Sequence, residues 1–311
     1  GQGQVTSWSQ IAADALGISL DDVEVWYGDT AIAAHGRDTY GSRSLAVGGV
    51  AVHLACQKVV EKAKKIAAHM LEAAEGDIEF SGGRFSVTGS PDRNVTIQDV
   101  SNAAFLANDL PDGMEPGLTE DTFFDPPNFT FPFGTHICVV EVDMETGKVT
   151  IPKYVAVDDC GPLINPPIVD GQLHGGIAQG IAQALYEEAI YDEDGNLVTG
   201  SMVDYLIPGA PEIPHFILDR TETPSPSNAL GVKGIGEAGT IGSPPAVVNA
   251  VIDALSYLGV EHIDMPTTPW RVWEAIQEAQ GRAAGEREAD RSARPPQATD
   301  RTEEDPTGGE A

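Results

Sequence analysis

A pair of alternating segments in the middle of the chain constrains its fold more than any other feature. Apolar and polar residues alternate over residues 136–142 and again over residues 149–157, and Glu145-Thr146-Gly147 between them favours a turn. This pattern is typical of a β-hairpin, in which consecutive strands are antiparallel. Residues 78–87 show a smaller version of the same pattern. Because helical segments also occur, the sequence favours an α+β or mixed α/β fold over a doubly wound parallel sheet.

Apolar residues at helical spacing indicate where the helices lie. Gly17 provides a C-terminal stop for the first helix, and Ser44 can cap the second. Thr96 and Asp99 resemble a capping box, and the last three helices begin with prolines, which suit the first helical position. The helices are predicted over residues 4–16, 44–74, 96–108, 165–188, 244–258 and 269–280.

The end of the chain differs in composition from the rest. After Gly281 it contains almost no large apolar residue, so residues 281–311 are predicted to be a disordered acidic tail. Residues 1–280 show no internal repeat or linker and are predicted to form one domain. Within this domain, residues 23–27 predict a strand, and residues 109–134, which are rich in Pro, Gly and Phe, predict a loop.

Charge and cysteine content exclude several classes of protein. The chain has 48 acidic and 18 basic residues, a net charge of -30, and no cluster of cations that could bind nucleic acid or an anionic membrane. No run of about 18 apolar residues occurs, so membrane insertion is not expected. The three cysteines are far apart and form no zinc or iron–sulfur pattern, which indicates a reducing, cytoplasmic compartment. Cys56 and Cys138 are expected to be small buried residues.

The negative charge is spread through the body of the chain. Residues 281–311 hold five Arg and eight acidic residues, so residues 1–280 carry -27 of the total. A folded domain with this charge repels itself unless salt screens it, and in molar salt the screening length falls to about 3 Å. The distribution favours adaptation to a high-salt cytoplasm, and an ordinary acidic protein is the alternative.

We therefore expect the thermal midpoint of the purified protein to rise as KCl is increased from low to molar concentration. Screening weakens the repulsion among the carboxylates in the folded state more than in the expanded unfolded state. Calorimetry across a KCl series measures this. A midpoint that does not change with KCl contradicts the high-salt interpretation.

Two short segments lie at predicted helix starts and could bind an anion. They are Gly1-Gln2-Gly3 and Gly41-Ser42-Arg43-Ser44. Helix N-termini present unpaired N–H groups and a partial positive charge, and Arg43 adds a guanidinium with forked donor geometry. A simple turn with a cap remains the alternative for either segment alone.

A third segment, Gly231–Gly242, holds a single carboxylate among glycines. It contains a Gly-x-Gly-x-x-Gly pattern, but no buried strand precedes it, so we reject a dinucleotide-binding motif. A glycine-lined loop lets the backbone approach a ligand closely, and its apolar surroundings would desolvate Glu237, which makes Glu237 a candidate general base. The alternative is that the Glu237 carboxylate only interacts with the positive N-terminal end of the helix that follows.

A fourth segment, Asp158–Pro166, is followed by three glutamines on one predicted helix face. Gln172 and Gln179 are seven residues apart, and Gln183 follows Gln179 by four. Amides on one face could form hydrogen bonds with a large polar heterocycle, or they could simply face solvent. No Ser-His-Asp order or paired-carboxylate motif is apparent, so a hydrolase lacks support.

Together and in this order, these segments resemble the molybdenum-binding large subunit of the xanthine dehydrogenase family of molybdenum hydroxylases, most closely its aerobic carbon monoxide dehydrogenase branch. The resemblance spans about residues 1–280, and its strongest part surrounds Glu237. It rests on Gly1-Gln2-Gly3, Thr39–Ser44, Val157–Gly161, Asn165-Pro166, Gln172, Lys233–Gly239 and Gly242–Pro245.

The resemblance implies a molybdopterin cofactor with molybdenum, often as the cytosine dinucleotide, bound between two halves of a larger subunit. Glu237 then occupies the position of the active-site glutamate, which lies next to molybdenum without being a tight ligand and acts as a base. The implied cofactor-binding residues are Gln2, Gly3, Thr39, Tyr40, Gly41, Ser42, Arg43, Ser44, Cys160, Asn165, Gln172, Lys233 and Gly234.

The implied reaction is oxidation of CO with water to CO2, with electrons passing to iron–sulfur and flavin subunits in a hetero-oligomer, by analogy a dimer of three-subunit units. Because the sequence opens inside the Gly-Gln-Gly segment, the chain is expected to be the C-terminal half of a subunit, inactive alone. The loop that binds copper in true carbon monoxide dehydrogenases would lie in the missing half. Hydroxylation of a small aldehyde or N-heterocycle is the first alternative, and a non-catalytic fragment or assembly module is the second.

Overall fold

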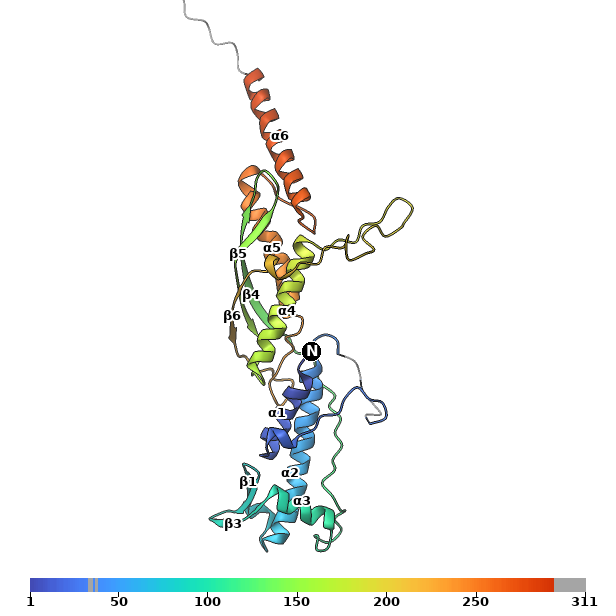
Figure 1. Cartoon of the computed structure of the whole chain (residues 1–311). Helices are drawn as coiled ribbons and strands as arrows, with labels where there is room; N and C mark the ends of the chain where they lie inside the picture. Colours follow the sequence, from blue (N-terminus) through green and yellow to red (C-terminus); the bar gives the residue numbers. More distant parts are fainter. Residues whose placement is uncertain (33–35, 37–38, 294–311) are drawn as a thin grey trace, which may run out of the picture.

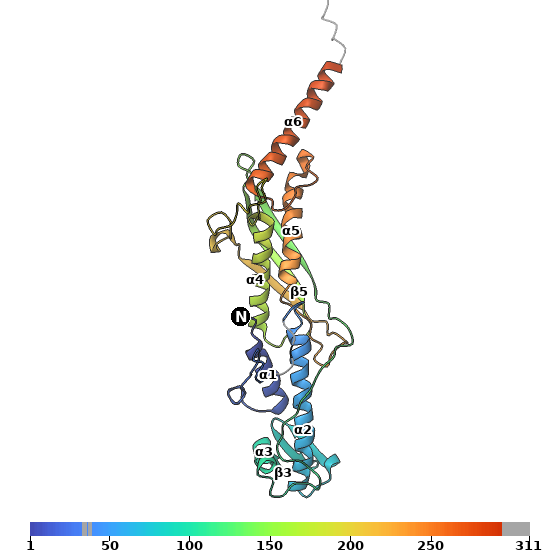
Figure 2. The same cartoon turned by 90° about the vertical axis from the view of Figure 1, so that its right-hand side faces the viewer.

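The protein is an elongated molecule with a small sheet near one end and a long helix at the other (Figures 1 and 2). The computed structural model describes residues 1–32, 36 and 39–293. The α-helices are α1 (Gln4–Leu16), α2 (Val50–Met70), α3 (Ile97–Leu106), α4 (Pro166–Leu185), α5 (Ala238–Leu255) and α6 (Pro269–Ala293). The strands are β1 (Ile78–Ser81), β2 (Arg84–Val87), β3 (Ser90–Thr96), β4 (Phe133–Val142), β5 (Val149–Asp159) and β6 (Phe216–Thr221).

In the described part of the chain, five short helical turns join these elements. A π-helical turn over Leu45–Gly49 leads directly into α2. The others are 3-10 turns over Leu20–Asp22, Glu75–Asp77, Ala210–Glu212 and Ser256–Leu258. No described helix is both long enough and apolar enough to span a membrane.

The two sheets have different topologies. Strands β1, β2 and β3 form an antiparallel meander that packs with α2 and α3 around the buried ring of Phe85. In the second sheet, β5 pairs antiparallel with β4 and parallel with β6. The parallel pair is joined by α4, as a parallel crossover requires. The mixed α and β architecture predicted from the hairpins is therefore confirmed.

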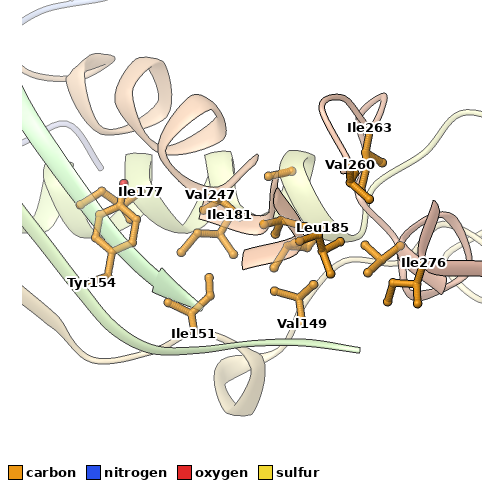
Figure 3. Packing of buried hydrophobic residues seen from close by; sticks show 14 of the residues in the cluster. Val149, Ile151, Tyr154, Ile177, Ile181, Leu185, Val247, Val260, Ile263 and Ile276 are labelled. Atoms are coloured by element: carbon orange, nitrogen blue, oxygen red, sulfur yellow. The ribbon is translucent and has the colours of Figure 1, made fainter. Parts of the chain in front are cut away.

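The largest core lies between the second sheet and the helices that cover one of its faces. Figure 3 shows Ile151 and Tyr154 of β5 facing Ile177 and Ile181 of α4, and all but Ile151 are fully buried. Burying a side chain of this size contributes about 1.5–3 kcal/mol. This core holds α4 and α5 against the sheet and so determines where their N-terminal ends lie.

Glycines let α5 pack closely against α4. A Cβ atom on Gly180 of α4 would lie 1.8 Å from the Ser243 hydroxyl oxygen, and one on Gly239 of α5 would lie 2.7 Å from the Ile177 nitrogen. On the sheet side, a Cβ on Gly242 would lie 2.6 Å from the His136 ring. The start of α5 is therefore held between α4 and β4 at nearly backbone-to-backbone distance.

Several local predictions are confirmed. Helix α1 has the predicted bounds, and Gly17 ends it in the left-handed conformation with φ of 63°. Thr96 and Asp99 form the capping box of α3, since each side chain accepts a hydrogen bond from the backbone of the other. Both hairpins form as predicted.

The predicted strand over residues 23–27 is wrong. These residues are irregular, and within the described part of the chain no strand lies beside them to complete the hydrogen bonds. Trp26 is 62 % exposed, and its ring nitrogen donates a hydrogen bond to Glu24 at 2.6 Å. The apolar pattern therefore corresponds to an exposed segment, and strands β3 and β6 were not anticipated.

Several predicted helix ends differ from the structure. Helix α2 ends at Met70 rather than near residue 74, and Glu72 just beyond it has φ of 48°. Helix α5 begins at Ala238, so Pro244 and Pro245 lie inside it rather than opening it. The tight contact of Gly239 with α4 stabilises the extra N-terminal turns despite the missing proline N–H groups.

The boundary predicted at residue 280 falls inside a helix. Helix α6 continues to Ala293, beyond the expected end at Gln280. The rest of the predicted tail, residues 294–311, lies outside the described residues. The division into a domain over residues 1–280 and a tail therefore stays a prediction.

The α4–α5 contact gives a matched pair of substitutions on one helix. Gly180→Ala forces a methyl group against Ser243 and Pro244, and we expect it to lower the unfolding free energy by about 1–3 kcal/mol. Gly175→Ala places its methyl group in open space, so the higher helix propensity of alanine is expected to raise stability by about 0.5–1 kcal/mol. Urea unfolding measures both. Changes of the same sign would contradict the close packing.

Candidate functional site

A pocket of about 300 Å³ lies where four segments from distant parts of the sequence meet. The segments are the start of α1, the loop that leads into the π-helical turn, the loop before α4 and the loop before α5. Its lining residues are Gln2, Gln4, Ser7, Trp8, Thr39, Tyr40, Gly41, Ser42, Ser44, Leu45, Cys160, Pro162, Ile164, Asn165, Ile168, Val169, Gln172, Lys233, Gly234, Ile235, Gly236 and Glu237.

The N-terminal ends of four helical segments converge on this pocket. Gln4 begins α1, Leu45 begins the π-helical turn, Asn165 is the N-cap of α4, and Glu237 is the N-cap of α5. Each N-terminus carries partial positive charge, and those of α1 and α5 also present unpaired N–H groups. Helix α4 contributes its dipole alone, because it begins with two prolines and its Ile168 N–H is capped by Asn165. Among the described residues that line the pocket, Glu237 is the one carboxylate. In a chain with a net charge of -30, this arrangement favours an anionic ligand.

Most of the residues singled out in the sequence line the pocket, but Gly3 and Arg43 do not. Gly3 is the N-cap of α1 with φ of 74°, and a Cβ there would lie 2.5 Å from the Ile168 Cδ1 atom. The Arg43 guanidinium lies 3.8 Å from the centroid of the Tyr40 ring and donates to the Tyr40 hydroxyl at 2.8 Å. Gly3 therefore lets the start of α1 pack closely against Ile168 of α4. Arg43 holds the Tyr40 ring in place by stacking on it and bonding to its hydroxyl.

Side-chain hydrogen bonds tie the first two segments together. The Gln4 amide donates to the Gln2 carbonyl at 2.7 Å and to the Thr39 hydroxyl at 3.0 Å. The hydroxyls of Thr39 and Ser44 are 2.6 Å apart. Ser44 thus bonds to Thr39 and makes no side-chain capping bond, so the prediction that it caps the second helix is wrong. The result is a continuous row of amides and hydroxyls along one wall.

Asn165 joins the α4 end of the pocket to α1. Its side-chain oxygen, Oδ1, accepts a hydrogen bond from the Ile168 backbone N–H at 3.1 Å, which caps α4. Its side-chain nitrogen, Nδ2, donates to the side-chain oxygen of Gln10 at 2.8 Å. Gln172, almost two turns into α4, also lines the pocket, whereas Gln179 and Gln183 are exposed elsewhere on the helix. The solvated-face alternative therefore applies to these two glutamines and not to Gln172.

A buried ion pair anchors the loop before α5. The Lys233 ammonium lies 2.9 Å from Asp159 at the end of β5, and the two side chains are 6 % and 0 % exposed. Burial by itself acts to raise the pKa of the Asp159 carboxyl, but hydrogen bonds from Lys233 and from the backbone outweigh it and hold that pKa well below its usual range. Lys233 forms part of the pocket wall, but its ammonium is engaged by Asp159.

The pocket also contains the buried thiol of Cys160. This side chain is 6 % exposed, and burial raises its pKa to about 11. The thiol therefore stays protonated at neutral pH, which makes it an apolar wall residue rather than a thiolate ligand. No group of three His, Cys, Asp or Glu residues within the described ranges could hold a metal ion.

Glu237 lies at the mouth of the pocket and not in a secluded position. The loop before it is buried from Val232 to Gly234, but the Glu237 side chain is exposed, so the predicted desolvation is wrong for this structure. The buried part of the loop ends at Gly234, because Ile235 and Gly236 are half-buried and Glu237, the N-cap of α5, lies beyond them. The Ser42 hydroxyl donates to Glu237 Oε2 at 2.8 Å. Both alternatives therefore apply to Glu237, because it is a pocket carboxylate and also the N-cap residue of a helix.

The sequence analysis missed ten lining residues. Ser7 and Trp8 follow Gln4 by three and four residues and so share its face of α1, which means that helical periodicity could have grouped these three residues. Pro162, Ile164, Ile235 and Gly236 lie inside the segments singled out above, although they were not named as site residues. Leu45, Ile168 and Val169 have no local signal, because their place depends on how the loops pack.

Comparison with known proteins gives consistent matches. Residues 1–214 match the molybdopterin cofactor-binding domain family. The chain is 45 % identical over 278 residues to the carbon monoxide dehydrogenase large chain of Hydrogenophaga pseudoflava, covering 89 % of this chain and 34 % of that protein. It is 42 % identical over 278 residues to the nicotine 6-hydroxylase large subunit of Paenarthrobacter nicotinovorans, with the same coverage of 89 % and 34 %.

A solved structure agrees with these matches. The crystal structure of a Cu,Mo-CO dehydrogenase in its carbon monoxide reduced state superimposes with a TM-score of 0.87 at 42 % identity. The match covers 90 % of this chain and 35 % of that one. The chain therefore spans about a third of the length of the proteins that it matches.

The buried ion pair yields a prediction with a pH dependence. Asp159→Asn leaves the Lys233 ammonium buried without its countercharge, and we expect it to lower the unfolding free energy by about 3–5 kcal/mol at pH 7. Because folding lowers the pKa of Asp159, its contribution is fully present above the unfolded value of about 3.9 and is lost as pH falls towards the folded value. The difference between wild type and variant is therefore expected to narrow below about pH 4.

Urea unfolding at pH 7 and near pH 3 measures this difference. Asp92→Asn is the matched control, since Asp92 is an exposed aspartate on β3, and its effect is expected to stay within about 0.5 kcal/mol. Equal effects of the two substitutions on the unfolding free energy at pH 7 would contradict a stabilising role of the buried pair.

Proposed function

Because the chain belongs to the family of molybdopterin cofactor-binding domains, we propose that its pocket forms part of the binding site for a molybdopterin cofactor in a molybdenum-dependent oxidoreductase. The observation that carries this proposal is the convergence of four helix N-termini on one pocket that contains a single carboxylate among its described residues. Phosphate groups are favoured at helix N-termini, and a pterin ring offers both donors and acceptors to amides.

The residues of the pocket fit such a cofactor. Gln2 and Gln172 present amides, which can donate and accept, and Thr39 and Tyr40 present hydroxyls. A Cβ on Gly41 would meet nothing within 4 Å, so a ligand can approach the backbone there. We propose that Gln2, Asn165, Gln172, Gly234 and all residues of the 39–44 loop except Arg43 contact the cofactor directly. Gly3, Arg43, Cys160 and Lys233 then support these contacts.

The bound cofactor supplies two-electron redox chemistry through its molybdenum. Glu237 supplies a base at the pocket mouth, because Ser42 occupies Oε2 and leaves Oε1 to accept a proton. The helix N-termini hold the phosphate end in place. The cofactor's nucleotide form, which we propose to be the cytosine dinucleotide, would extend from that end.

For the complete enzyme we propose oxidation of CO with water to CO2 in a high-salt cytoplasm, with electrons passing to iron–sulfur and flavin partner subunits. The 45 % identity to a carbon monoxide dehydrogenase large chain supports this. A copper site would lie in the part of the subunit beyond this chain. Hydroxylation of an N-heterocycle or aldehyde is the second candidate, because the 42 % identity to a nicotine 6-hydroxylase large subunit is nearly as high. A non-catalytic assembly module is the third.

Metal content separates these candidates. The complete large subunit is produced with its partner subunits in a host that makes the cofactor, and molybdenum and copper per protein are measured by mass spectrometry. Both metals near stoichiometric amounts support CO oxidation, and molybdenum alone supports a hydroxylase. A folded preparation without molybdenum contradicts cofactor binding and leaves the assembly role.

Glu237→Gln in the complete enzyme is expected to lower kcat by about 10²–10⁴-fold, because a positioned base is lost. Molybdenum content is expected to stay unchanged, since the amide keeps the shape of the carboxylate. Glu222→Gln is the control, because Glu222 is exposed and does not line the pocket. Steady-state kinetics with metal analysis test this. Wild-type turnover in Glu237→Gln would refute the role of Glu237 as the base.

A further inference from the structure

The loop between Tyr40 and Arg43 contains a serine in an unfavourable backbone conformation. The Arg43 N–H bonds to the Tyr40 carbonyl, and both residues between them have positive φ, 57° for Gly41 and 55° for Ser42. Turns with positive φ at both central positions are dominated by Gly, Asn and Asp, because a Cβ atom is crowded there. Serine at position 42 therefore costs stability that glycine would not.

The Ser42 side chain meets the loop before α5 at contact distance. A Cβ on Gly234 would lie 2.5 Å from the Ser42 Cβ and 2.3 Å from its carbonyl oxygen. A Cβ on Gly236 would lie 3.3 Å from the Ser42 hydroxyl oxygen. The glycines of this loop thus make the space into which Ser42 fits, and the fit brings its hydroxyl to the Glu237 carboxylate.

Nothing else among the described residues fixes that carboxylate. Glu237 is exposed, and as the N-cap of α5 it makes no capping hydrogen bond with its side chain. The bond from Ser42 to Oε2, at 2.8 Å, joins residues 195 positions apart. A long, exposed glutamate side chain otherwise samples several rotamers, so this bond selects one position for it.

We infer that Ser42 is a positioning residue for Glu237, which it holds in one orientation with Oε1 directed to the reacting atoms. This inference rests on the proposed function of Glu237 as the base. It explains why serine occupies a position where the backbone favours glycine, because only a side chain with a donor can hold the carboxylate. The contacts proposed between the 39–44 loop and the cofactor then come from the other residues of that loop and from its backbone.

Ser42→Gly in the complete enzyme separates positioning from folding. Glycine relieves the backbone strain at φ of 55°, so the thermal midpoint is expected to be no lower than that of wild type. Molybdenum content is expected to stay unchanged. Because the base is no longer fixed, kcat is expected to fall by about 10- to 100-fold with little change in KM. A crystal structure of the variant is expected to show the Glu237 side chain in more than one rotamer.

Ala107→Gly is the matched control. Ala107 also has a positive φ, 53°, but it ends α3 and lies outside the pocket lining. Its thermal midpoint is likewise expected not to fall, with kcat unchanged. A fall in kcat in this control would show that relief of backbone strain, and not the lost hydroxyl, causes the effect.

The other outcomes are distinct. Wild-type kcat in Ser42→Gly, with Glu237→Gln impaired, overturns the positioning role and leaves the proposed function intact. Loss of molybdenum in Ser42→Gly overturns the positioning role in favour of cofactor binding by Ser42. A rise in KM that accounts for the whole fall in kcat/KM overturns it in favour of substrate binding by Ser42. Wild-type turnover in Glu237→Gln refutes the proposed role of Glu237 as the base, on which this inference rests. In the double variant, a positioning role predicts no further loss beyond Glu237→Gln, and an additive loss contradicts it.

Discussion

The close contact between α4 and α5 determines where the candidate site lies. Gly180 and Gly239 let the two helices approach until a single added methyl group would overlap the neighbouring chain. Gly242 brings the same helix equally close to His136, which is itself held by hydrogen bonds to Tyr154 and Asp158. With α5 restrained on two sides, the backbone of its N-cap residue, Glu237, has little freedom to shift. The position of that backbone is thus a consequence of packing between helices and a sheet, and Ser42 then orients the carboxylate.

The buried Lys233–Asp159 pair gives the loop before α5 a second point of attachment. Asp159 ends β5, accepts from the Lys233 ammonium, and also accepts from the Thr221 hydroxyl and the Thr223 backbone beside β6. One carboxylate therefore joins two strands and the glycine-rich loop. Because that carboxylate is fully buried, its contribution depends on every donor being in place. The loop can be rich in glycine and still be rigid, since its ends are fixed by charge and by helix packing.

Local chemistry explains which parts of the fold could be predicted from the sequence. Gly17, the Thr96–Asp99 capping box and Asn165 ahead of Pro166 act within a few residues, and each forms as predicted. Pro244 and Pro245 misled, because contact with α4 extends α5 past them. Most of the motif residues do meet at one pocket, as the sequence predicts. The exposure of Glu237 and the contact of Ser42 with Gly234 depend on how distant segments pack, so no local pattern predicts them.

The order of the lining residues along the chain also determines when the pocket can form. Its lining begins at Gln2 and is completed only by Glu237, so a chain emerging from the ribosome presents the first wall long before the last. Until then, the converging helix ends face water. A ligand that needs all four segments can bind only after the fold has closed, and by mass action it then stabilises the closed state alone. Binding of such a ligand therefore requires that residues 2–237 have been synthesised and folded, and its occupancy reports on completed folding of the site.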